Sequence, residues 1–309
     1  MNTRRILTFV AVLLFALVAT AEDSAKETHL LRYKFSEGEQ VRWKVVHVGT
    51  TETTIQGNTQ TSKSHSASTK VWKVSEVDEQ GNMTFVHLVD SVDMWQQVSD
   101  RPEIRYNSEK TKEVPTEYEH VAKTVGVPLA TVKISAKGDI IDRDTPTPSE
   151  DFGVGGIVML LPEKPVKIGS TWYEPSELRN RLPDGRVKRV KIRKLYELVK
   201  VKTGVATISI KTEVLTPFND ARIQSQLVQQ LTDGTIKFDL DAGRILSKQL
   251  DWDETVVGFN GADSLMKYLA RFTEELLPAE ARTAQRIEKA GAAKTARASR
   301  DGKPALRRE

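Results

Sequence analysis

Five acidic residues in the last third of the chain are the first candidates for catalytic chemistry. They cluster near the ends of predicted hairpins and are Asp239, Asp241, Asp251, Asp253 and Glu254. Paired carboxylates can transfer protons or bind calcium. No calcium-loop spacing is present, however, and Asp beside Gly is an ordinary turn sequence. We therefore predict no catalytic residue. The alternative hypothesis is a hydrolase that acts on envelope polymers through the carboxylates near Asp251.

Other residue types that carry chemistry do not occur at the spacings that their chemistry requires. The chain has no cysteine, which excludes disulfides, thiolate metal sites and a lipoprotein cysteine. Its five histidines lack metal-ligand spacing, and they are His29, His47, His65, His87 and His120. The glycine-rich residues 153–156 lack the Gly-Lys-Ser/Thr ending of a phosphate loop. We predict no metal and no cofactor, and the sequence favours a protein that is not an enzyme.

Tryptophan supplies the candidate ligand-binding residues. All five tryptophans lie on or beside predicted strands, and they are Trp43, Trp72, Trp95, Trp172 and Trp252. Aromatic residues in such positions most often fill the core of a sheet. They can also line a hydrophobic groove, because barrels and half-barrels enclose ligands. The second interpretation predicts that the protein binds an apolar or lipid-like ligand.

Basic residues form a second candidate surface. If residues 186–194 form a strand, Arg189, Lys191 and Arg193 share one face and could contact an anionic polymer or a membrane surface. A solvated sheet face is the plainer interpretation. The basic tail, residues 279–309, could tether the protein to anionic envelope material. The net charge is only +4, and basic and acidic residues are interleaved, so we expect no nucleic-acid partner.

The elements that would position these residues are mostly β-strands. Apolar and polar residues alternate along residues 186–252, as Val190, Ile192 and Tyr196 do with their charged neighbours, and a period of two predicts strands with one buried face. Residues 50–69 predict a long hairpin around Gly57, with a disordered loop as the alternative. Residues 114–125 predict the one helix. For residues 222–231 and 263–277 both a strand and a helix fit, and we predict strands. Residues 30–35 also predict a short strand.

The N-terminus predicts export. Arg4 and Arg5 precede an apolar run, residues 6–18, and Ala19-Thr20-Ala21 is a small-x-small cleavage site. Residues 1–21 are therefore predicted to be a signal peptide, with an uncleaved anchor as the rival interpretation. We expect a mature protein that is periplasmic or secreted and has no transmembrane span. Residues 279–309 contain almost no large apolar residue and are predicted to be disordered.

The mature chain divides into two halves that resemble each other, residues 22–145 and 146–278. Each half runs through a Gly before a Trp, a strand–turn–strand pair and a closing hairpin, in the same order but at drifting spacings. The plain alternative is that any two β-meanders look alike. The predicted fold is mainly β. Antiparallel meanders form curved sheets or half-barrels in two similar halves, with one short helix and a disordered C-terminal tail.

The second half also carries a family resemblance. Leu161-Pro162, Pro165-Val166, Gly169 and Trp172, followed by the meander at Tyr196 and by residues 234–243, resemble an uncharacterised family of secreted bacterial β-rich proteins. The resemblance implies an exported bacterial β-protein of unknown function. The long antiparallel strands also look like the curved sheets of periplasmic lipoprotein carriers, a likeness of architecture alone. Together these patterns predict a non-catalytic envelope protein that binds an apolar ligand or acts as a scaffold.

Overall fold

The computed structural model describes residues 27–145, 156, 158–181 and 185–278. The predicted signal peptide, most of the glycine-rich linker and the predicted disordered tail lie outside the described residues. No helix among the described residues is long and apolar enough to span a membrane.

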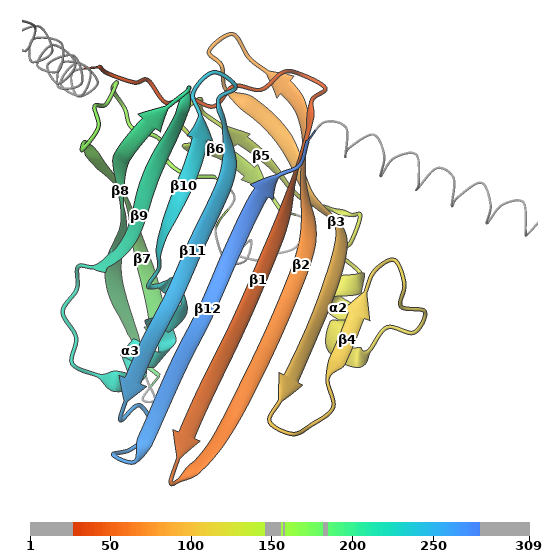
Figure 1. Cartoon of the computed structure of the whole chain (residues 1–309), viewed down its shortest axis with the longest axis vertical. Coiled ribbons are helices and arrows are strands. Elements are labelled where there is room, and N and C mark those ends of the chain that lie inside the picture. The colour runs from red at the N-terminus through yellow and green to blue at the C-terminus, as the bar shows by residue number, and fades with distance from the viewer. Residues whose placement is uncertain (1–26, 146–155, 157, 182–184, 279–309) are drawn as a thin grey trace, which may run out of the picture.

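The described chain forms one 12-stranded antiparallel sheet (Figure 1). The first half contributes β1 (Gln40–Ile55), β2 (Asn58–Val77), β3 (Met83–Val98), β4 (Ile104–Asn107), β5 (Pro128–Ile134) and β6 (Ile140–Asp144). The second half contributes β7 (Thr171–Arg181), β8 (Val187–Lys202), β9 (Val205–Val214), β10 (Asp233–Asp239), β11 (Arg244–Val257) and β12 (Ser264–Leu276). The order across the sheet is β6-β5-β3-β2-β1-β12-β11-β10-β9-β8-β7, and β4 pairs with β3. This result confirms the predicted fold class.

The first and last strands, β1 and β12, lie side by side in the middle of this sheet. From β1 the chain meanders outward to the edge strand β6, continues from the opposite edge at β7, and meanders back to β12. β1 and β12 then pair along almost their whole length, from Trp43 opposite Leu276 to Ile55 opposite Ser264. Because this ladder joins the two halves, they form one sheet instead of two.

Short helices occupy matching places in the two halves. η1 (Thr116–Tyr118) and α2 (Glu119–Ala122) come before β5. α3 (Ala221–Leu227) and η2 (Val228–Gln230) come before β10. In Figure 1 the edge strands curl away from the viewer, and α2 lies behind β3 while α3 lies behind the lower part of β11, on the side toward which the sheet curls. We call this side the inner face.

A division of the chain into two domains stays a prediction.

The core lies on the inner face because the strands alternate. Along β9, for example, Ala206, Ile208 and Ile210 are buried while the residues between them are more exposed. The main cluster of buried residues joins Val132 on β5 to Ile208 on β9 and Phe238 on β10, which lie on opposite sides of the β1–β12 seam. The inner faces of the two halves therefore share one core, as expected for a sheet that curls over itself.

Two segments without strand structure complete this core. In the segment before β1, Leu31, Tyr33 and Phe35 are buried in the main cluster. The Tyr33 hydroxyl donates a hydrogen bond to the carbonyl of Met159, over 3.1 Å, in the segment that leads to β7. The short strand predicted over residues 30–35 was wrong, although Leu31, Tyr33 and Phe35 are buried and the residues between them are more exposed. Their amides bind scattered carbonyls, such as those of Ala136 and Gly243, instead of one partner strand.

The structure confirms some of the predictions for individual elements and contradicts others. Residues 50–69 form the long β1–β2 hairpin, and residues 264–276 form the strand β12, as predicted. Residues 222–231 are mostly helical, so the strand predicted there was wrong. The Asp220 carboxylate accepts a hydrogen bond from the Arg222 amide and caps this helix, and Ile223 and Leu227 are buried along it. The helix predicted over residues 114–125 is shorter than expected, spanning η1 and α2.

Candidate functional site

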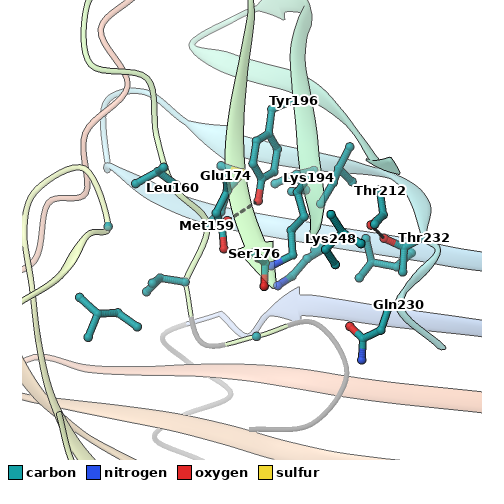
Figure 2. A pocket seen from close by; sticks show the side chains of 18 of the residues that line it. Met159, Leu160, Glu174, Ser176, Lys194, Tyr196, Thr212, Gln230, Thr232 and Lys248 are labelled. Atoms are coloured by element: carbon teal, nitrogen blue, oxygen red, sulfur yellow. Dashed lines mark hydrogen bonds and ion pairs between the residues drawn. The ribbon is translucent and has the colours of Figure 1, made fainter. Parts of the chain in front are cut away.

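A cavity of about 680 Å³ lies on the inner face, mostly in the second half, and is also lined by Gly138, Asp139, Ile140 and Arg143 of the first half. Strands β7 to β11 form most of its wall, and Val158, Met159 and Leu160 border it from the segment between β6 and β7 (Figure 2). Its apolar lining includes Leu178, Ile192, Ile210, Ile236, Leu250 and Trp252. These residues occupy inward-facing positions of neighbouring strands, so the period-two pattern that builds the core also builds the cavity wall.

The helical segment before β10 borders the cavity at η2. α3 packs its buried Ile223 and Leu227 against Val190 and Ile192 of β8. The carbonyl of Gln229 then accepts a hydrogen bond from the indole of Trp252, over 3.0 Å, and the neighbouring Gln230 lines the cavity. α3 thus fixes both the position of η2 and the orientation of Trp252.

Polar residues form a band across the inner face at this level. Glu174 on β7 lies opposite Lys194 on β8, and Lys194 lies opposite Thr212 on β9. The Lys194 ammonium lies 3.2 Å from Glu174 Oε1, and the hydroxyl groups of Thr212 and Thr232 are 3.0 Å apart. All four residues line the cavity, and we call them the polar belt. A polar belt in a mostly apolar wall gives a ligand a defined orientation.

Tyr196 holds the carboxylate of the polar belt in place. Its hydroxyl donates a hydrogen bond of 2.8 Å to Glu174 Oε2. Burial raises the pKa of Tyr196 well above its ordinary value, and the negative charge of Glu174 raises it further. The phenol therefore stays protonated and acts as a donor. Its ring stacks on Trp172, with the ring centroids 5.6 Å apart.

A buried ion triad lies where the two halves meet. Lys70 Nζ on β2 lies 2.5 Å from Glu274 Oε1 on β12, and Lys248 Nζ on β11 lies 3.5 Å from Glu274 Oε2. Burial alone would raise the pKa of Glu274, but the charges of Lys248 and Lys70 outweigh it and lower the pKa. Burial lowers the pKa of Lys70, and Glu274 only partly offsets this effect. Lys248 also lines the cavity.

The five predicted ligand-binding tryptophans do not gather at one site. Trp252 lines the cavity. Trp43 and Trp72 are buried in the main core, where their rings pack edge to face. Trp172 lies beside the cavity against Tyr196 and donates its indole hydrogen bond to the Leu160 carbonyl. Trp95 is partly exposed and stacks on His65. The structure therefore brings one predicted tryptophan to the cavity wall and a second one next to it.

The candidate carboxylates do not converge. Asp251 follows Leu250 and precedes Trp252, and neighbouring residues of a strand point to opposite faces, so its side chain lies on the outer face. There it pairs with Arg271, at 2.6 Å, and accepts a hydrogen bond from Gln249. Asp253 is exposed, and Asp239 accepts amide hydrogen bonds within its own turn. Within the described part of the chain, no three His, Cys, Asp or Glu residues are grouped to hold a metal ion.

The candidate basic residues share the outer face of β8, as the alternation requires. Arg193 pairs with Glu213 at 2.6 Å, and Arg189 pairs with Glu177 at 3.5 Å. Lys191 is exposed. The outer face of this strand therefore carries both signs of charge. The contact of these residues with an anionic surface stays a prediction.

The polar belt and the buried ion triad were not predicted. The sequence signal that could have indicated them is a polar residue at a position of a strand where the alternation predicts an apolar, inward-facing one. Glu274 interrupts the alternation of Ala270, Phe272 and Leu276, and Lys194 stands between Ile192 and Tyr196 at the same spacing. A charge at an inward position must find a buried partner or a cavity. The sequence does not indicate which partner it finds.

Comparisons with known proteins identify no family for this chain. No family model matches it, and no curated protein matches it. A structure titled for lipid–protein interactions in lipovitellin aligns over 79% of this chain, with 11% sequence identity and a TM-score of 0.42. The alignment spans 26% of that longer chain. A DUF1329 family protein from Desulfovibrio piger aligns over 82% of this chain and 88% of its own, with 10% identity and a TM-score of 0.15. Both scores are low, so neither likeness bears on function.

Proposed function

We propose that this protein binds an apolar or lipid-like ligand in the inner-face cavity and that it acts without catalysis. The cavity itself carries this proposal. Its volume of about 680 Å³ lies within the range of roughly 300–1,000 Å³ for small-molecule sites. Aliphatic side chains and polar groups share its wall, so a ligand there can bury an apolar part while polar groups in fixed positions orient it.

The fold supports binding at this place. The strands around the cavity are long and continuously paired, so the wall is rigid, and rigid walls reduce the entropy cost of binding. The Glu174 carboxylate of the wall is held in place by other protein groups. It forms an ion pair with Lys194 and accepts a hydrogen bond from Tyr196.

The test uses the full chain and the neutral fluorescent probe N-phenyl-1-naphthylamine. We expect saturable probe fluorescence with the wild type, and displacement of the probe by a medium-chain alcohol. Ile210→Trp should fill the cavity and weaken binding at least tenfold. Val257→Trp is the matched control. Val257 is 65% exposed at the end of β11, so this substitution should leave binding unchanged. No saturable binding by a folded wild type, or equal binding by both variants, would overturn the proposal.

The two other predicted roles stay hypotheses. The hydrolase hypothesis requires Asp251 to act from the outer face, where Arg271 and Gln249 already bind its carboxylate. Loss of a measured hydrolytic activity in Asp251→Asn would support it. The tether through the basic tail depends on residues 279–309, which lie outside the described residues, and the scaffold role stays a prediction.

A further inference from the structure

We propose that the ligand is a single-chain amphiphile with a carboxylate head group, and that Lys194 of the polar belt binds this head group. The proposal rests on the proposed function, because it names the class of ligand for the same cavity. Three features carry it. The polar belt offers hydrogen-bond donors, its carboxylate Glu174 is already bound by other side chains, and apolar side chains line the cavity on both sides of the belt.

Three cationic side chains line the cavity, Arg143, Lys194 and Lys248, and Lys194 is the one that belongs to the polar belt, while Lys248 is buried against Glu274. An ammonium has three donors, and the hydrogen bond to Glu174 uses one of them. The Lys194 side chain is 35% exposed and lines the cavity, so its remaining donors are within reach of a ligand. Figure 2 shows the amine of Lys194 and the hydroxyl of Ser176 directed into the cavity. Both groups can donate to the same acceptor.

The threonines of the belt add a further donor. The hydroxyl groups of Thr212 and Thr232 bind each other, so one of the two donates and the other keeps its proton. That remaining proton can be donated to a ligand oxygen. The amide of Gln230, which also lines the cavity, supplies two more donors. The polar side of the cavity is therefore rich in donors.

The carboxylate of the belt is already engaged. Glu174 Oε1 accepts from Lys194, and Glu174 Oε2 accepts from Tyr196. A cationic head group would have to compete with both of these contacts. An anionic head group can use the donors that Lys194 and the hydroxyls leave over, and these contacts have to outweigh its repulsion by the nearby Glu174 carboxylate. Charge-assisted hydrogen bonds of this kind are about twice as strong as neutral ones.

The wall on each side of the belt suits an alkyl chain. On one side lie Tyr196, Ile210 and Ile236, which belong to the main core. On the other side lie Leu178 and Ile192, which belong to the cluster under α3. A chain attached to a head group at the belt contacts aliphatic side chains in either direction. The cavity volume matches one small ligand, which favours a single chain.

The experiment compares dodecanoate with dodecanol as competitors of the bound neutral probe, at pH 8 and below their aggregation concentrations. The two competitors share one chain and differ in the charge of the head group. We expect dodecanoate to bind about tenfold more tightly, which corresponds to one charge-assisted hydrogen bond. Lys194→Met should abolish this preference, and Lys194→Arg should keep most of it.

Lys211→Met is the matched control. Lys211 is exposed on β9 next to Thr212, but its side chain points to the outer face, so the preference should be unchanged. Circular dichroism of each variant reports whether the sheet is intact. Equal binding of the two competitors by the wild type, or a preference that survives Lys194→Met, would overturn the carboxylate proposal while the cavity proposal stands. Failure of both competitors and of the probe to bind would instead overturn the proposed function.

Discussion

The ammonium of Lys70 and the carboxylate of Glu274 lie 2.5 Å apart in the core, although 204 residues separate them in the chain. Their strands, β2 and β12, flank β1 on either side. Lys70 also lies over the ring of Trp43, 4.5 Å from its centroid. This pair therefore ties the middle of the sheet together on its inner face, at the seam between the two halves.

Removing one partner of this pair should destabilise the fold strongly. Glu274→Gln leaves two lysines buried near each other without their shared carboxylate, and we expect a loss of about 3–5 kcal/mol in the free energy of unfolding. Urea unfolding followed by far-ultraviolet circular dichroism measures it. The matched control is Asp251→Asn, which breaks the exposed pair with Arg271 between β11 and β12 and should cost less than about 1 kcal/mol. A similar loss in the two variants would contradict this assignment.

Stability should fall as the pH drops from 6.5 to 4 because of His87. Burial, together with the charge of Lys70, lowers the pKa of His87 from its ordinary 6.5 to about 4. In this range the unfolded chain binds a proton at His87 that the folded chain does not bind. The resulting loss is up to about 3 kcal/mol and is complete below pH 4.

Substitution of His87 tests this pH dependence. His87→Gln should reduce the slope of unfolding free energy against pH between 6.5 and 4. Some slope should remain, because burial also lowers the pKa of His47. As the pH falls below about 4.5, the free energy of unfolding should decrease a second time. The lowered pKa of Glu274 stabilises the fold at higher pH, and protonation of this carboxylate removes that contribution. An unchanged slope in His87→Gln would rule out His87 as the source.

Gly234 should not tolerate a side chain. A Cβ atom built there lies 2.1 Å from the carbonyl oxygen of Gln249 on the neighbouring strand β11. We expect Gly234→Ala to destabilise the protein by roughly 1–3 kcal/mol through overpacking, measured by thermal unfolding. Gly49→Ala is the control, because its Cβ makes an ordinary contact at 3.4 Å with the Ser64 hydroxyl. Equal stability of the two variants would show that β10 and β11 can move apart at this point.

Trp252 should report ligand binding by its fluorescence. It is the one tryptophan in the described lining of the cavity, and a ligand against its ring should change its emission. We expect a spectral shift on adding dodecanoate to the wild type, and loss of most of this shift in Trp252→Phe. Trp95→Phe should keep the shift, since Trp95 stacks on His65 away from the cavity lining. A shift that disappears only in Trp95→Phe would place the ligand elsewhere.

The strands could be predicted because alternation is a local property. Apolar and polar residues alternate along most of β8 and β9, with Lys194 as an exception, so both the strands and their buried faces followed from the sequence. The helix α3 was missed because Ile223 and Leu227 fit either period over so short a segment. The Asp220 cap is the local signal in the sequence that favours a helix here.

The sequence by itself determined the fold class, the inward and outward faces of the strands, and the absence of cysteine chemistry. Each of these depends on residue type or on neighbours within a few positions. Only the tertiary structure decided that β1 pairs with β12, that Glu274 meets Lys70 and Lys248, and that Glu174, Lys194 and Thr212 line one cavity. Such contacts depend on strand order and on the curl of the sheet. Hydrogen bonding between backbones is nearly the same for every sequence, so the pattern within a strand does not specify its neighbour.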